Sequence, residues 1–190
     1  MKALGTFILV LLLLAGVALV GYSRWTGVVA DADSALAAGR LEEALAAYER
    51  ADAQFARVPA ATQLLRREHA RVAANRLWVL YALKRYDDTI DAAEQAPLEA
   101  APQFWSGCAY FEKAVAEKQP EARLGWLVRA EEQFRKAVEA APADWDTKFN
   151  YEMTTRLAAE LRKNPKTPPS QMMQLLRPTA SGTKAPRRVG

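Results

Sequence analysis

The sequence predicts an all-α protein, and three observations support this fold class. Alanine, the residue with the highest helix propensity, accounts for 38 of the 190 residues. From residue 28 onward, apolar residues recur at steps of three and four, which is the spacing of one helix face. Strict apolar–polar alternation, which is typical of strands, never continues for more than a few residues. We therefore expect an N-terminal transmembrane helix followed by a stack of antiparallel helical hairpins.

The N-terminal segment is apolar enough to cross a membrane. Residues 4–22 are uncharged, and a helix of this length at about 1.5 Å per residue nearly spans a hydrocarbon core of ~30 Å. Tyr22 and Trp25 follow, where aromatic residues suit the membrane interface. We expect residues 1–25 to form an anchor with short flanks. The alternative is a signal peptide cleaved near Ala18, which would release a secreted protein.

The expected orientation places the body of the protein outside the cytoplasm. Lys2 and the amino terminus lie on one side of the apolar run, and Arg24 lies on the other, so the charge difference is small. A short N-terminal tail before a single span usually stays in the cytoplasm. We therefore expect a single-pass bacterial membrane protein with a periplasmic or extracellular body.

Residues 26–163 have the pattern of paired helices separated by short linkers. Gly39 and Pro59 mark the ends of the first two helices, Thr62 and Asp87 are candidate N-caps, Pro120 suits a first turn, and Asp144 is a candidate N-cap. The helices are expected at residues 30–38, 41–58, 62–83, 88–95, 103–117, 120–141 and 145–163. Each pair is too small to bury its own apolar face, which predicts a stack.

Residues 164–190 form a tail rich in Pro, Ser, Thr and basic residues, which we expect to be largely disordered. Within it, residues 170–177 are amphipathic, with Met172, Leu175 and Leu176 on one helical face. A segment this short is unstable alone. It is predicted to dock either on this chain's own helices or on a partner.

The residue counts argue against an enzyme, a metal site or a bound cofactor. The chain has one cysteine, Cys108, and one histidine, His69, and no second ligand or Gly-rich phosphate loop accompanies them. The whole chain carries +4 and residues 163–190 carry +6, so the remaining residues carry −2. The charge distribution therefore does not indicate a basic face on the folded body, and neither nucleic acid nor a small-molecule substrate is expected as a partner.

Three sets of residues resemble the tetratricopeptide (TPR) repeat family. The residues that match its turn, small-residue and large-residue positions are Gly39, Leu41, Ala44, Tyr48 and Ala51; Tyr86, Thr89, Ala93, Ala96 and Pro97; and Ala130, Phe134, Ala137 and Pro142. The small-residue positions recur at intervals of 45 and 41 residues rather than the 34 of the family, so the repeats are degenerate. The resemblance covers roughly residues 28–160.

The resemblance implies a protein-binding groove lined by the first helix of each pair. On the second pair this face would present Arg71, Asn75, Trp78 and Tyr81, a combination that suits peptide binding. The structural alternative is that Asn75 makes local hydrogen bonds and Trp78 belongs to the core. Trp105, Trp126 and Trp145 are expected in the core.

The overall layout also resembles the MxaK-like proteins, most of all at residues 144–152. Those proteins accompany MoxR-type ATPases and von Willebrand A-domain proteins, so the resemblance implies an accessory in the assembly of a membrane or periplasmic complex. We expect a membrane-tethered scaffold that binds a protein partner. The alternative is a structural subunit of a membrane oligomer that has no dedicated peptide groove.

Overall fold

A computed structural model describes residues 2–164 of the chain. Helices account for 88% of these residues, and none of them lies in a strand, so the all-α fold class is confirmed. The chain divides into two compact units, Met1–Trp105 and Ser106–Gly190. Residues 170–177, with Met172, Leu175 and Leu176, lie outside the described part.

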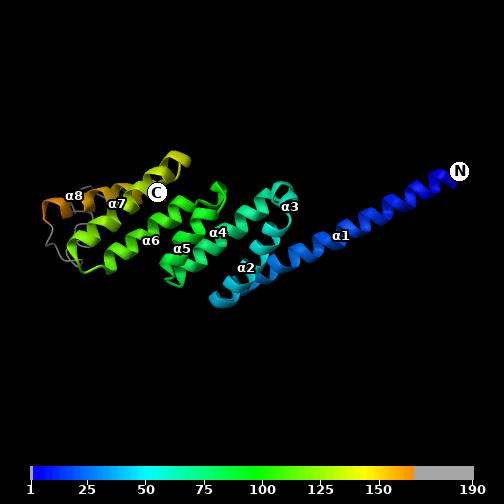
Figure 1. The fold of residues 1–190 in the computed structure, drawn as a ribbon, viewed down its shortest axis with the longest axis horizontal. Helices are drawn as coiled ribbons and strands as arrows, with labels where there is room; N and C mark the ends of the chain where they lie inside the picture. The colour runs from blue at the N-terminus through cyan, green and yellow to red at the C-terminus, as the bar shows by residue number, and fades with distance from the viewer. Residues whose placement is uncertain (1, 165–190) are drawn as a thin grey trace, which may run out of the picture. The chain divides into compact units, whose positions relative to one another are not determined.

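The first helix, α1 (Lys2–Ala37), is continuous over 36 residues (Figure 1). The sequence analysis placed a boundary after residue 25 and a separate helix at residues 30–38, and both positions fall inside α1. No proline interrupts α1. Gly27 lies near the expected boundary, and a single glycine in a helix lowers its stability by only about 1 kcal/mol relative to alanine. Asp33, a residue near the start of the helix expected at residues 30–38, therefore lies well inside α1.

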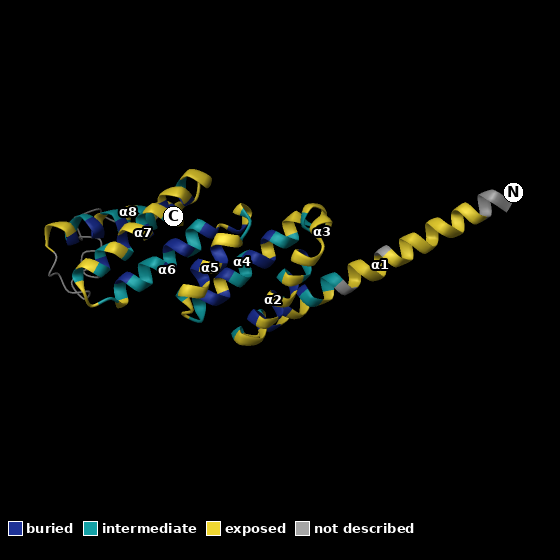
Figure 2. Ribbon diagram, viewed as in Figure 1, coloured by how far each residue is buried: buried dark blue, intermediate teal, exposed yellow. Residues whose placement is uncertain are grey.

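The two halves of α1 differ in exposure (Figure 2). The large apolar side chains from Phe7 to Tyr22 are exposed, whereas Val29, Ala32 and Ala35 are buried in the first unit. By length and composition, α1 could cross a membrane. One helix therefore joins an exposed apolar half to a half that packs in the folded body.

The turn between α1 and α2 (Leu41–Arg57) has the geometry that glycine favours. Gly39 has a φ of 71°, in the left-handed region, and its N–H donates to the Leu36 carbonyl. The Arg40 N–H donates to the Ala35 carbonyl, which completes the hydrogen bonds of a Schellman motif. The predicted helix end at Gly39 is confirmed.

The predicted helix at residues 62–83 is instead two helices, α3 (Pro59–Leu64) and α4 (Arg66–Ala82). Pro59 occupies the first turn of α3, where its missing N–H costs nothing. The Thr62 hydroxyl donates to the Phe55 carbonyl at 3.2 Å, so it ties α3 to the end of α2 rather than capping a long helix. None of the residues of α3 is buried.

The turn between α4 and α5 (Tyr86–Gln95) repeats the first turn. Lys84 has a φ of 60°, and the N–H groups of Lys84 and Arg85 donate to the carbonyls of Tyr81 and Leu80. Asp87, the predicted N-cap, lies in the first turn of α5. A short 3₁₀ helix, η1 (Leu98–Ala100), follows α5.

The core of the first unit forms where α2 packs against α1 on one side and α4 on the other. Its largest fully buried side chains belong to α2 and α4 and are Tyr48, Phe55, Val72, Leu77, Val79 and Leu80. Small residues, including Ala32, Ala44 and Ala51, lie between them and let the helices approach closely.

The second unit is built from most of α6 (Pro102–Ala116), together with α7 (Pro120–Ala140) and α8 (Trp145–Lys163). The bounds of α8 match the prediction, and Asp144 caps it by accepting a hydrogen bond from the Thr147 N–H. The buried Leu127, Leu157 and Leu161 form its core.

A buried arginine holds the corner between α6 and α7. The Arg123 guanidinium donates to the Glu117 carbonyl from Nε at 3.0 Å and from a terminal nitrogen at 2.8 Å. The last carbonyls of a helix have no partner within the helix. Arg123 supplies that partner at the end of α6, which explains why this charged side chain is buried.

Candidate functional site

Two of the four predicted groove residues belong to a polar network inside the first unit. Asp33 of α1 accepts a hydrogen bond from the Tyr48 hydroxyl at 2.6 Å, and the Asn75 amide nitrogen donates to that hydroxyl at 2.9 Å. Arg71 forms an ion pair with the second oxygen of Asp33 at 2.5 Å. The network joins α1, α2 and α4 and uses Arg71 and Asn75 for contacts within the chain.

Burial raises the pKa of Tyr48 to about 12 because it disfavours the phenolate, and the hydrogen bond that its hydroxyl donates to Asp33 adds to the rise. Tyr48 is completely buried. A phenol in this position stays protonated over the physiological pH range. Tyr48 therefore acts as a fixed hydrogen-bond donor between the helices.

We expect the stability of the first unit to fall as pH rises from about 10 to about 12. In this interval the unfolded state has lost the Tyr48 proton and the folded state has kept it, so each pH unit favours unfolding by about 1.4 kcal/mol per proton. Tyr48→Phe should cost about 1 kcal/mol at pH 8 through the lost hydrogen bond. The difference from the parent should vanish at about pH 10.7 and have the opposite sign at about pH 11.5.

Urea unfolding of detergent-solubilised protein at several pH values would measure how the free energy of unfolding of the parent and of the Tyr48→Phe protein depends on pH. Burial and the charge of Glu112 raise the pKa of the Cys108 thiol to about 12, which adds a pH dependence of the same sign. A Cys108→Ser background removes that contribution. A constant difference between the Tyr48→Phe protein and its parent from pH 8 to pH 11.5 would contradict the interpretation.

The other two predicted groove residues have different environments. The Tyr81 ring lies 5.8 Å from the rings of both Tyr86 and Trp105, so it is part of an aromatic cluster within the first unit. Trp78 is 41% exposed. The four predicted residues therefore do not form one open strip: Arg71 and Asn75 hold helices together, Tyr81 packs against other rings, and Trp78 faces solvent.

A basic depression lies beside the first turns of α4. It has a volume of about 600 Å³ and is open to solvent. Its lining is Arg66, Arg67, Ala70, Arg71, Ala74 and Glu99. Arg66 pairs with Glu99 and Arg71 with Asp33, whereas Arg67 has no ionic partner among residues 2–164.

A second charged group joins α2 to α4 in the first unit. Asp52 contacts His69 Nε2 at 3.4 Å and Arg76 at 2.9 Å. The His69 ring also packs against Phe55, with ring centroids 4.8 Å apart. His69 thus has a structural environment at the interface of two helices. Within the described part of the chain, no group of three or more metal-ligating side chains comes together.

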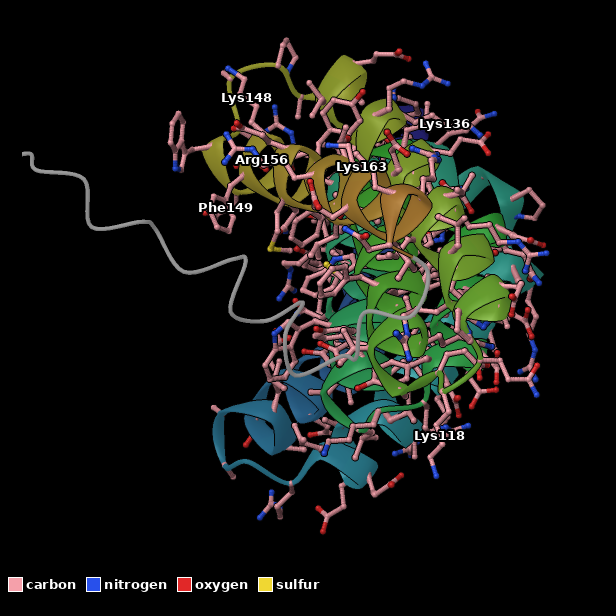
Figure 3. The ribbon with its side chains drawn as sticks, turned by 90° about the vertical axis from the view of Figure 1, so that its left-hand side faces the viewer. Lys118, Lys136, Lys148, Phe149, Arg156 and Lys163 are labelled. Carbon is pink, nitrogen blue, oxygen red and sulfur yellow. The ribbon has the colours of Figure 1, made fainter. Side chains whose placement is uncertain are left out.

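The most exposed large aromatic residues of the body are on α8. Trp145 is 75% exposed and Phe149 is 53% exposed, and they are four residues apart, so they share one helix face. Figure 3 shows Phe149, Lys148 and Arg156 projecting outward from α8. Within residues 2–164, Lys148 has no ion-pair partner, and Arg156 pairs with Glu152. We call Trp145, Lys148 and Phe149 the α8 aromatic face.

The prediction that Trp145 belongs to the core is wrong. The buried positions of α8 include Thr147, Thr154 and Leu161, at steps of seven residues, and Trp145 lies on the opposite side of this helix. The helical spacing of these positions was the available sequence signal. Trp105 and Trp126, the other two tryptophans expected in the core, are partly buried and pack against the two core clusters.

Trp126 is held in a cation–aromatic cluster. Its ring stacks on Tyr110 with centroids 5.9 Å apart, and Lys113 Nζ and the Arg129 guanidinium lie 4.3 and 4.7 Å from its centre. These contacts join α6 to α7 and account for Trp126 without a ligand. Among the large aromatic side chains of the second unit, the α8 aromatic face thus stands out by its exposure.

Comparisons with protein families, with curated proteins and with solved structures gave no match to this chain.

Proposed function

We propose that the protein is a membrane-tethered helical scaffold that binds a protein partner. The observation that carries this proposal is the division of α1 into an exposed apolar half and a half packed in the body. Exposed leucines and valines over four helical turns are costly in water and favourable in lipid. Because the helix is continuous, the body would be mounted on the bilayer without a flexible linker.

The hairpin architecture supports a degenerate TPR-like scaffold. The turns at Gly39 and Lys84 have the same hydrogen bonds and left-handed geometry, and they are 45 residues apart. This interval equals the one between Ala44 and Thr89, two of the small residues that resemble the family. Such repeats commonly serve as binding platforms because their stacked helices leave extended surfaces.

The α8 aromatic face is the best-supported partner surface. Exposed aromatic side chains dominate binding energy at many interfaces, and Trp145 and Phe149 are largely exposed. Lys148 between them suits an acidic rim around an apolar pocket of the partner. Trp78 is a second exposed aromatic residue, whereas Arg71, Asn75 and Tyr81 already make contacts within the chain.

The resemblance to the MxaK-like proteins extends the proposal to an assembly accessory with its N-terminus in the cytoplasm and its body in the periplasm. A MoxR-type ATPase or a von Willebrand A-domain protein is the partner class that this resemblance implies. Neither a cofactor nor a small-molecule substrate is part of the proposal.

Photo-crosslinking in native membranes tests the partner surface. The full chain would carry p-benzoylphenylalanine at position 149, with position 139 as the control, because Glu139 is also exposed in the second unit. We expect a discrete adduct from position 149 alone, and mass spectrometry would identify the protein in it. An adduct between two differently tagged copies would favour the oligomer alternative, and equal products from both positions would contradict the surface.

Substitution of the aromatic pair should separate binding from stability. Trp145→Ala with Phe149→Ala is expected to weaken partner binding at least tenfold, because each aromatic anchor contributes about 2 kcal/mol at a central position. The free energy of unfolding should change by less than about 0.5 kcal/mol, because both side chains are exposed. Co-purification with the crosslinked partner and urea unfolding measure the two effects.

A further inference from the structure

The end of α2, the whole of α3 and the start of α4 form a corner of the first unit. This corner lies beside the point where the apolar half of α1 ends. The Trp25 and Phe55 rings meet with centroids 5.1 Å apart, which places the end of α2 beside residue 25. Phe55 also packs on His69 of α4. Tyr22, the last residue of the uncharged run, is only three residues before Trp25, or about 4.5 Å along the helix axis.

This corner, residues 57–67, combines exposed apolar side chains with unpaired positive charge. Leu64 is 84% exposed and Val58 is 43% exposed. The corner contains three arginines and no acidic residue. Arg57 and Arg67 have no ionic partner among residues 2–164, although Arg66 pairs with Glu99. A short helix with exposed apolar residues between arginines suits the boundary between lipid headgroups and acyl chains.

The charge placement is unfavourable for the helix itself. Arg66 and Arg67 occupy the first turn of α4, where the helix dipole disfavours positive charge. The basic depression of about 600 Å³ opens at the same turns. An anion bound at these turns would interact favourably with the helix dipole and would neutralise the positive charge of the clustered guanidinium groups. Glu68 in the same turn and the Arg66–Glu99 pair offset part of this positive charge, so the charge that remains for a phosphate group is mainly that of Arg67.

We propose that residues 57–67 dock on the surface of the bilayer that holds α1, and this inference rests on the membrane anchor proposed above. Val58 and Leu64 enter the boundary of the acyl chains, and Arg57 and Arg67 bind the phosphates of anionic lipids. The body then has two attachments to the membrane, the α1 span and this corner. Two attachments fix the tilt of the first unit relative to the bilayer, which a single span does not.

Site-directed spin labelling of the full chain in liposomes tests the proposal. In a Cys108→Ser background, single cysteines would replace Gln63 in α3, Leu12 in the apolar half of α1, and Ala38 at the far end of the α1–α2 hairpin. Ala38 is 16 residues beyond Tyr22, about 24 Å along the helix. Power saturation compares the accessibility of each label to oxygen, which concentrates in lipid, and to a water-soluble nickel complex.

In phosphatidylglycerol-containing liposomes, the label at position 63 should show an oxygen-to-nickel ratio well above that at position 38 and below that at position 12. Leu64→Glu should reduce the ratio at position 63 toward the aqueous value. The Arg57→Gln and Arg67→Gln pair should reduce it too, and so should replacing phosphatidylglycerol with phosphatidylcholine. The ratio at position 12 should not change in any of these comparisons.

Each other outcome overturns the inference in a distinguishable way. If position 63 is aqueous while position 12 lies in hydrocarbon, the anchor stands and the corner does not touch lipid, which leaves its arginines for an acidic protein partner. If position 12 is aqueous, the anchor fails and this inference fails with it. If position 63 lies in lipid regardless of the substitutions, the span alone sets its depth and the docking contacts do not exist.

Discussion

Phe134→Ala is expected to lower the free energy of unfolding of the second unit by about 3–5 kcal/mol. The Phe134 ring is buried, and it fills the space beside Gly107 of α6. A β-carbon built on Gly107 would come within 2.8 Å of two ring carbons of Phe134. The glycine therefore makes room for the ring, and removing the ring leaves a cavity between α6 and α7.

The same contact reverses the usual effect of replacing a helical glycine with alanine. Gly107→Ala should destabilise the unit by about 1–3 kcal/mol because the added methyl group overpacks against Phe134. Gly125→Ala is the matched control, since Gly125 lies in α7 with open space where its β-carbon would be. That substitution should stabilise the protein by about 0.5–1 kcal/mol through helix propensity.

A double-mutant cycle tests the contact directly. In the Phe134→Ala background the space beside residue 107 is free, so Gly107→Ala should become neutral or stabilising, which is a coupling of about 2–3 kcal/mol. Urea unfolding of detergent-solubilised full chain, with hydrogen exchange read on peptides from α6, α7 and α8, measures each variant. If Gly107→Ala stabilises the parent protein as much as Gly125→Ala does, the contact does not control packing.

Features with a local cause could be predicted from the sequence. Gly39 ends α1 because only a residue that tolerates positive φ fits the turn, and Asp144 caps α8 through its own side chain. The bounds of α8 follow from such signals at each end, with Asn164 as the C-cap. The all-α fold class likewise follows from composition and from the three-and-four spacing of apolar residues.

Features that depend on distant residues could not be predicted in this way. Asp33 meets Tyr48 and Arg71 only after three helices have packed, and no local pattern distinguishes it from an N-cap. The division at Leu65 accompanies a hydrogen bond from Thr62 of α3 to Phe55 of α2, a contact that no local sequence pattern shows. The groove residues were therefore predicted from their positions in a repeat pattern. The contacts that Arg71 and Asn75 make with α1 and α2 could not be predicted in this way.

Substitutions in the exposed apolar half of α1 should have the largest effect on whether the protein is found in the membrane. Leu12→Arg with Leu13→Arg is expected to move the full chain out of the membrane fraction. Each arginine near the centre of a span costs about 2.5–3.5 kcal/mol, and the lost leucines add several tenths of a kcal/mol each. The pair therefore lowers the insertion equilibrium by more than about a thousandfold. Both side chains are exposed, so the folded body should be unaffected.

The matched control is Ala37→Arg with Ala38→Arg, which adds the same charge at exposed positions at the other end of α1. This control should remain in the membrane fraction and resist extraction with alkaline carbonate. N-terminal sequencing of the wild-type protein separates an anchor from a signal peptide: an anchor retains residues 1–18, whereas cleavage near Ala18 yields a soluble chain that starts near Leu19. In the second case α1 would lose most of its exposed apolar half. The chain would then have no membrane span, and nothing would hold the corner at residues 57–67 against a bilayer.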